Sequence, residues 1–216
     1  LDALDKKGSY EELLSHAEDI APAQRTPAWE KLVEKAASGY MASLTKGSSS
    51  FEGVWTSQSF VKRYPFLTKS QDFMTKRGEA GKSAAERCLA DSYRGQHCID
   101  MMKEFLQTTG TSPEVGLAFG KITRKNQNHY VAVPFFKWAL DAKKDASFCG
   151  DEDLKLAVVA GLGLPADYDN AIDSRAIATG TCWDTMKADL KTELVKNPGG
   201  YYKDNTCAVL KSKGDL

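Results

Sequence analysis

The sequence has no excess of charge of either sign, since its 29 Lys and Arg residues are matched by 29 Asp and Glu residues. Nucleic-acid-binding domains normally carry a clear basic excess, so this balance argues against a nucleic-acid partner. Long apolar runs are absent as well. The longest run, at residues 154–164, is interrupted by Gly161 and Gly163 and closed by Pro165. A membrane-spanning helix needs about 20 apolar residues, so we expect no transmembrane segment.

Motifs that indicate catalysis or metal binding are also missing. The chain has three histidines and five cysteines, without HExxH, CxxC, GxSxG, a glycine-rich phosphate loop or calcium-loop spacing. His97 and Cys98 would point about 100° apart on a helix, whereas a catalytic thiolate–imidazole pair needs facing side chains. Asp167, Asp169 and Asp173 lack the glycine and terminal glutamate of a calcium loop. We expect no catalytic residue, no metal site and no cofactor, which makes an enzyme the less favoured interpretation.

Signals for β-strands are scarce, because no segment alternates apolar and polar residues and no Asn-Gly or Asp-Gly turn occurs. Helical signals are frequent: Thr26 is a good N-cap for a helix with Pro27 in its first turn. Helix pairs are expected at residues 83–92 with 96–107, 113–125 with 128–142, 151–161 with 168–178, and 182–196 with 201–211. We predict an all-α fold of roughly ten helices. Apolar residues at helical spacing predict a core that includes Trp29, Leu32, Leu89, Met102, Phe105, Phe119, Phe136, Ala139 and Trp183.

A repeat is visible in residues 117–140, LAFGKITRKNQNHYVAVPFFKWAL, which indicate two helices around a short polar turn. Three positions of its second helix recur 34 residues earlier in the chain: Ala132, Phe136 and Ala139 fall on Cys98, Met102 and Phe105. This pattern resembles the tetratricopeptide repeat family. Gly120 lies at the small position of such a unit, and Trp29 and Leu32 match its Trp-x-x-Leu opening.

The resemblance covers about half of the chain. It implies a right-handed stack of antiparallel helix hairpins, an α-α superhelix, in a single repeat domain over residues 1–216. The low-complexity stretch KGSSSFEG gives a weak boundary near residues 46–53. The aromatic residues of 55–74 match no repeat, and an α-helical repeat of another type is an alternative.

The cysteines suggest two disulfides. Cys88 and Cys98 flank the turn DSYRG, and Cys182 and Cys207 flank the turn NPGG. Cysteines on adjacent antiparallel helices are placed to staple a hairpin. We therefore predict Cys88–Cys98 and Cys182–Cys207 bonds and a free Cys149. Buried thiols that act as small apolar side chains are the alternative.

Disulfides also bear on location, because they persist in oxidising compartments. The chain does not begin with methionine, and its first residues, LDALDKKGSY, already resemble part of a helix. We therefore expect a trimmed N-terminus from which a signal peptide or a lipid-anchored cysteine has been removed. The predicted location is the periplasm or the exterior of a bacterium.

Basic side chains give the one candidate binding site. In tetratricopeptide-like stacks the first helix of each unit lines a groove, and the resemblance places Arg87, Lys121, Arg124 and Lys125 on or beside that helix. Such a groove would hold an acidic peptide or a carboxylate terminus; the alternative is a solvated helix face. We predict an exported scaffold that binds a peptide or partner protein. The second hypothesis is a helical domain of a cell-envelope enzyme, such as a cell-wall lyase or hydrolase, which a deep cleft with a buried carboxylate would favour.

Overall fold

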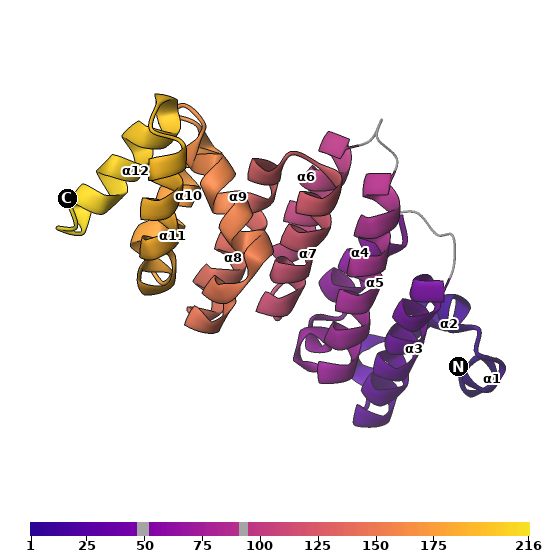
Figure 1. Ribbon diagram of the computed structural model, residues 1–216. Helices are drawn as coiled ribbons and strands as arrows, with labels where there is room; N and C mark the ends of the chain where they lie inside the picture. The colour runs from indigo at the N-terminus through magenta and orange to yellow at the C-terminus, as the bar shows by residue number, and fades with distance from the viewer. Residues whose placement is uncertain (47–51, 91–94) are drawn as a thin grey trace. The chain divides into compact units, whose positions relative to one another are not determined.

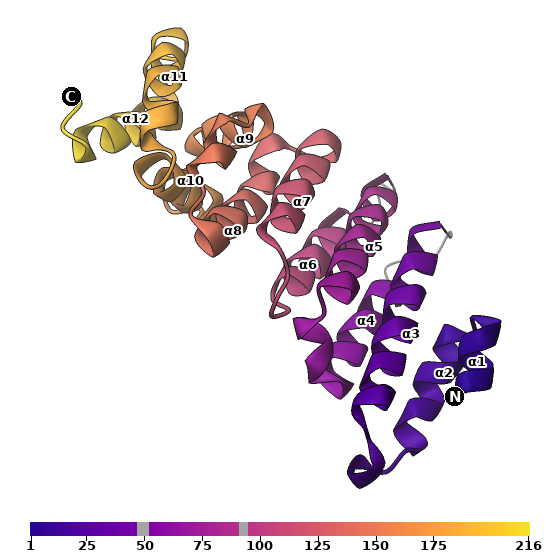
Figure 2. The same cartoon turned by 90° about the horizontal axis from the view of Figure 1, so that it is seen from below.

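The computed structural model describes residues 1–46, 52–90 and 95–216. All of the regular elements in this part of the chain are helices (Figures 1 and 2), which confirms the all-α class. Within the same ranges, no helix is both long enough and apolar enough to cross a membrane. The twelve described α-helices are α1 (Asp2–Lys7), α2 (Tyr10–His16), α3 (Pro27–Lys46), α4 (Glu52–Arg63), α5 (Gln71–Ala90), α6 (Gly95–Leu106), α7 (Pro113–Asn126), α8 (Val133–Lys143), α9 (Glu152–Leu162), α10 (Asp169–Thr179), α11 (Trp183–Lys196) and α12 (Gly200–Ser212).

Local signals in the sequence set several of the helix starts. The backbone N–H of Trp29 donates to Thr26 Oγ1 at 3.3 Å, so Thr26 caps α3 as predicted. Asp151 caps α9 in the same way, because its Oδ1 accepts from the N–H of Asp153 at 3.0 Å. Pro134 lies in the first turn of α8, where the missing N–H removes no intrahelical bond.

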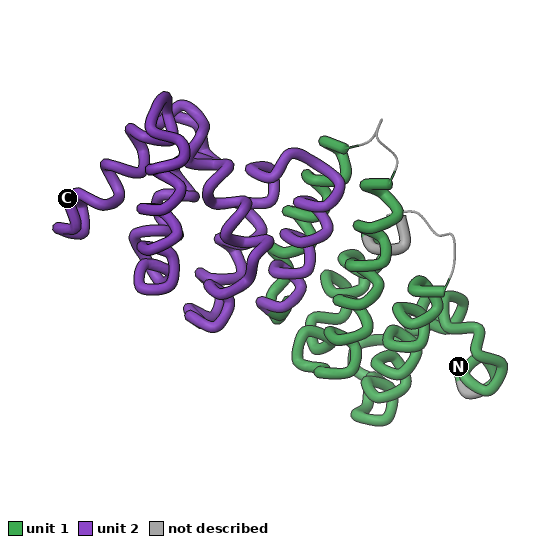
Figure 3. Tube along the Cα trace, viewed as in Figure 1, with its two compact units in different colours: residues 1–112 green, residues 113–216 purple. Residues whose placement is uncertain are grey.

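The described chain divides into two compact units, unit 1 (Leu1–Ser112) and unit 2 (Pro113–Leu216), which are coloured separately in Figure 3. The sequence placed its weak boundary elsewhere, near residues 46–53. Helices α3 and α5 lie on either side of that stretch and pack against each other, so both belong to unit 1. Residues 47–51 themselves lie outside the described residues.

In unit 1, α3 packs against α2 and α5, and α5 packs against α6. The aromatic segment that matched no repeat supplies much of the core, since Phe60, Tyr64 and Phe73 are buried against residues of α2 and α3. Trp55 is the exception, with 43% of its surface exposed. The segment is therefore mainly structural.

In unit 2, the pairs α7–α8, α9–α10 and α11–α12 pack against each other. Close packing explains the small residue in α7: a Cβ atom at Gly120 would lie 2.6 Å from the Phe136 ring. Ala132, Phe136 and Ala139, the positions that carry the repeat, are all fully buried.

Most of the predicted core is confirmed. Leu32 and Trp183 are the two predicted residues that are only half-buried. The predicted residues that are buried are Trp29, Leu89, Met102, Phe105, Phe119, Phe136 and Ala139.

Among the residues of unit 1 whose burial the structure describes, one buried side chain is charged. Arg77 of α5 is 1% exposed, and its Nε donates to Ser57 Oγ at 3.2 Å. One terminal nitrogen donates to Thr111 Oγ1 at 3.2 Å; the other donates to Thr108 Oγ1 at 2.9 Å and to the carbonyl of Phe105 at 3.4 Å. The guanidinium carbon lies 3.7 Å from the centroid of the Phe105 ring. Arg77 thereby ties α4, α6 and the turn after α6 to α5.

Candidate functional site

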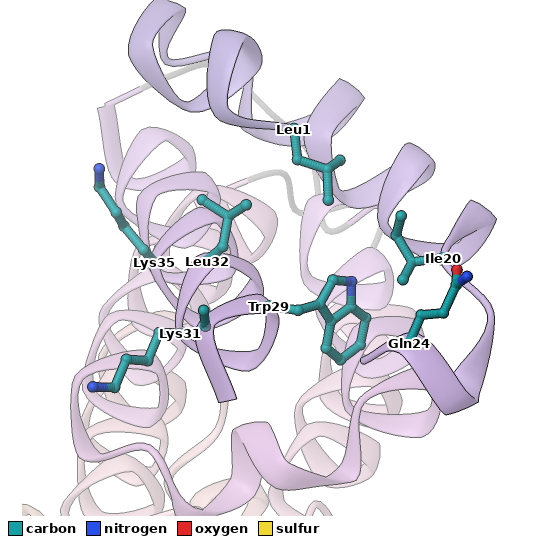
Figure 4. Close-up of a pocket in the computed structure, with 8 residues that line it drawn as sticks. Leu1, Ile20, Gln24, Trp29, Lys31, Leu32 and Lys35 are labelled. Carbon is teal, nitrogen blue, oxygen red and sulfur yellow. The ribbon is translucent and has the colours of Figure 1, made fainter. Parts of the chain in front are cut away.

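The candidate site is an open groove of about 530 Å³ in unit 1 (Figure 4). One wall is α3, and the other is formed by the start of α1 and by the connector between α2 and α3, which contains the 3₁₀ turns η1 (Ala17–Asp19) and η2 (Pro22–Gln24). The groove is lined by Leu1, Ile20, Gln24, Ala28, Trp29, Lys31, Leu32 and Lys35.

The groove has an apolar floor. Leu1, Ile20 and Leu32 converge above the ring of Trp29 in Figure 4. The indole ring is held in place, because its Nε1 donates to the carbonyl of Ala17 at 3.3 Å and its edge-to-face contact with Tyr64 has a centroid separation of 5.7 Å. Leu32 is half-buried rather than buried because it faces this groove.

Two lysines form the outer rim along α3. Lys31 and Lys35 are four positions apart, which places them on one side of the helix. Lys35 Nζ lies 2.7 Å from Asp5 Oδ2 of α1, and this hydrogen bond raises the pKa of Lys35 above its ordinary value. Lys31 is exposed and forms no ion pair with any residue that the structure describes. The rim therefore carries positive charge beside an apolar floor.

A second open groove of unit 1, of about 670 Å³, has the opposite character. It lies where the α1–α2 turn meets the C-terminal half of α3, and Tyr10, Glu11, Glu12 and Tyr40 contribute to its lining. Burial raises the pKa of Tyr40, and the nearby Glu11 carboxylate adds to this effect. The Glu11 and Glu12 side chains thus give this groove an acidic rim, in contrast to the lysines that line the α3 groove.

The four basic residues predicted to bind a partner lie elsewhere. Arg87 of unit 1 donates to Ser83 Oγ at 2.7 Å and to the carbonyl of Leu44 at 3.3 Å, so it links α5 to the end of α3. The other three belong to α7 in unit 2. A common groove for all four thus remains a prediction.

Two of these three α7 residues have acidic partners within unit 2. Lys121 pairs with Asp151, and Arg124 pairs with Asp153, at the start of α9. Lys125 is exposed and has no ion-pair partner in the described ranges. The sequence did not reveal this pairing, because it depends on how α7 packs against α9.

The disulfides agree with the prediction in one case of two. Cys88 and Cys98 are bonded, with their Cα atoms 5.8 Å apart. Cys182 is bonded to Cys149, with a Cα–Cα distance of 5.1 Å, and Cys207 is free. The predictions of a Cys182–Cys207 bond and of a free Cys149 were therefore wrong.

The reason is helix geometry. Cys182 precedes α11, at its far end from the turn, whereas Cys207 lies in the middle of α12. At about 1.5 Å per residue, the two cysteines differ by roughly 10 Å in their height above the turn, and a disulfide needs Cα atoms less than about 7 Å apart.

The structure gives no metal centre in the described residues, since no three His, Cys, Asp or Glu side chains are grouped there as ligands. Cys98 is bonded in a disulfide and supplies no thiolate. His97 instead contacts Trp55 edge-to-face, with centroids 6.1 Å apart.

The groove residues were missed by the sequence analysis, although the spacing of Lys31, Lys35 and the apolar Ala28 and Leu32 was a usable signal.

Comparison with protein-family models, with curated proteins and with solved structures gives no match to this chain.

Proposed function

We propose that this protein is a helical scaffold that binds an acidic, partly apolar segment of a partner protein in the groove of unit 1. The observation that carries the proposal is the pairing of an apolar floor around Trp29 with the two lysines of the rim. Apolar contacts provide affinity for a helical or extended segment, and charges at the rim select acidic partners and speed their association.

The open form of the groove supports a binding surface rather than an enzyme active site. Small substrates are usually enclosed by a concave pocket that buries most of their surface. A surface groove along a helix fits the side of a peptide better. The helix pairs, together with the close approach of Gly120 to Phe136, support a tetratricopeptide-like stack as the scaffold.

The disulfides support export as part of the same proposal. Each unit contains one bond, Cys88–Cys98 or Cys149–Cys182. Disulfides are rare in the reducing cytosol of mesophiles and common in the periplasm and outside the cell. We therefore place the scaffold in a bacterial periplasm or on the cell exterior, where its partner would also lie.

The proposal is tested with a defined probe, the fluorescein-labelled peptide LDALDEELDALDEE, in fluorescence anisotropy titrations of the full chain. Lys31→Glu is expected to weaken binding about fivefold, which corresponds to about 1 kcal/mol. Raising the salt concentration should weaken binding as well, because exposed charges are screened. The matched control is Lys62→Glu, an exposed lysine of α4 outside the groove, which should leave the affinity unchanged.

The neutral peptide LNALNQQLNALNQQ distinguishes recognition of the acidic side chains from nonspecific apolar binding. It should bind more weakly than the acidic probe. Equal binding of both peptides, or an equal loss in Lys31→Glu and Lys62→Glu, contradicts the proposed site. Absence of binding by either peptide contradicts the function itself.

A further inference from the structure

We infer that α1 covers part of the ligand-binding face of α3 and is displaced when the ligand binds, and that the external ligand is a short acidic helix with the same arrangement of side chains. The inference rests on the proposed function and specifies its partner. The side chain of Leu1 points into the groove above Trp29 (Figure 4), and Asp5 of α1 pairs with Lys35 of the rim. In this way α1 places the Leu1 side chain beside Trp29 and the Asp5 carboxylate against Lys35.

The sequence of α1 explains how it does so. Leu1, Leu4 and Asp5 are three and four positions apart, so they share one side of the helix. Both leucines are partly buried against the core of unit 1. This side of α1 therefore has two leucines about one turn apart followed by a carboxylate. A partner that competes for the groove needs the same pattern.

The attachment of α1 is weak enough to be displaced. With six residues, α1 is too short to be stable without tertiary contacts. In the ion pair between Lys35 and Asp5, the lysine side chain is 62% exposed and the aspartate side chain 17%, and an ion pair with one solvent-exposed partner contributes little to stability. The other carboxylate oxygen, Asp5 Oδ1, is buried without a hydrogen-bond partner in the described structure, which is unfavourable for the seated helix.

The connection between α1 and α2 suits a movable element. Gly8 ends α1 with a φ of 70°, in the left-handed region that glycine adopts without strain. Its N–H donates to the carbonyl of Asp5, and the N–H of Ser9 donates to the carbonyl of Leu4, which stops the helix at this turn. A rotation about the Gly8 backbone that opens the Ser9–Leu4 hydrogen bond moves α1 relative to α3.

An external ligand has one contact that α1 lacks. Lys31 has no acidic partner in the described chain, although it lines the same groove. A longer acidic helix pairs with Lys31 and Lys35 together, whereas α1 pairs with Lys35 alone. This difference in contacts is what allows the ligand to replace α1.

The test uses the full chain with the substitution Asp5→Asn, which removes the ion pair to Lys35 and keeps the size of the side chain. If α1 competes with the ligand, its release should tighten binding of the peptide LDALDEELDALDEE about fivefold. The reason is that the apparent Kd equals the intrinsic Kd divided by the fraction of molecules in which the site is uncovered. The matched control is Asp141→Asn, which breaks the exposed Lys137–Asp141 pair of α8 in unit 2 and should leave the Kd unchanged.

Hydrogen exchange provides the second readout. Asp5→Asn should accelerate exchange of the amides of α1, and saturating peptide should do the same in the unsubstituted chain. Tighter binding with faster exchange supports the inference. Peptide binding that is equal or weaker in Asp5→Asn, or peptide binding that protects α1, overturns the inference and leaves the proposed function standing. If the peptide binds neither protein, the proposed function fails and the inference fails with it.

Discussion

The buried charge of Arg77 gives the sharpest prediction about stability. The guanidinium is almost fully buried, and its four hydrogen bonds all end on neutral oxygens. Within the described ranges no carboxylate pairs with it. Burial lowers the pKa of Arg77 from its ordinary value to about 9. We propose the substitutions Arg77→Met and Arg77→Lys as a matched pair.

The magnitude follows from two opposing contributions. At about 1.4 kcal/mol per pH unit, the lowered pKa corresponds to roughly 5 kcal/mol of unfavourable charge burial. Hydrogen bonds from a charged donor contribute about 1.5–3 kcal/mol each, and a desolvated cation over an aromatic ring adds about 2 kcal/mol. At the low end of these ranges, the favourable contacts of Arg77 exceed the cost of burial by about 3 kcal/mol.

The two variants remove different parts of this balance. Methionine keeps an apolar stem beside Phe105 and removes the charge, so we expect unit 1 to lose about 2 kcal/mol. Lysine keeps the charge but lacks the planar fork that reaches four acceptors at once, so we expect a loss of about 4 kcal/mol.

Urea unfolding of the disulfide-bonded protein, followed by circular dichroism, measures both losses. Arg175 of α10 is the control. It is half-buried and also donates to neutral acceptors, Asn205 Oδ1 at 2.9 Å and the carbonyl of Ala166 at 2.6 Å. Because it remains partly in contact with water, Arg175→Met and Arg175→Lys should differ by less than about 1 kcal/mol. If Arg77→Lys is as stable as Arg77→Met, burial of the charge is not the dominant cost and the reasoning is refuted.

The remaining predictions concern the disulfides, one glycine and one tyrosine. Replacing both cysteines of Cys149–Cys182 by serine should cost about 4 kcal/mol, against about 3 kcal/mol for Cys88–Cys98, because the bonds close loops of 33 and 10 residues; a reversed order in urea unfolding contradicts the loop-length argument. Gly120→Ala should destabilise unit 2 by about 1–3 kcal/mol, because the new Cβ meets an aromatic ring at 2.6 Å, whereas Gly150→Ala meets no atom within 4 Å and should be neutral. Burial raises the pKa of Tyr64. The folding stability that is linked to this shift is present below pH 10 and is lost as the pH rises through the folded-state pKa. An absorbance titration in which Tyr64→Phe leaves unchanged the number of tyrosines that ionise at raised pH contradicts this assignment.

The helices were largely predictable because their signals are local. Thr26 and Pro27 fixed the start of α3, and the spacing of Phe136 and Ala139 fixed the buried side of α8. Gly120 signalled a close helix contact before its partner was known. Such features need only neighbouring residues and helix periodicity.

Contacts between segments that are distant in the chain were not predictable by the same means. Lys121 and Arg124 look free on their own helix, and only the packing of α9 brings Asp151 and Asp153 to them. The partner of Cys182 lies 33 residues earlier in the chain, beyond any hairpin argument. The groove likewise combines α1, a connector and α3, whose contacts are tertiary.

The placement of one disulfide inside each unit limits how far the chain lengthens under tension. Residues between bonded cysteines cannot be drawn out when the ends are pulled apart. The Cys149–Cys182 bond spans 33 residues, which at about 3.4 Å per residue withholds about 110 Å of contour length. The Cys88–Cys98 bond spans 10 residues and withholds about 35 Å. Under oxidising conditions, unit 2 thus gains less contour length than unit 1 when both are unfolded by stretching.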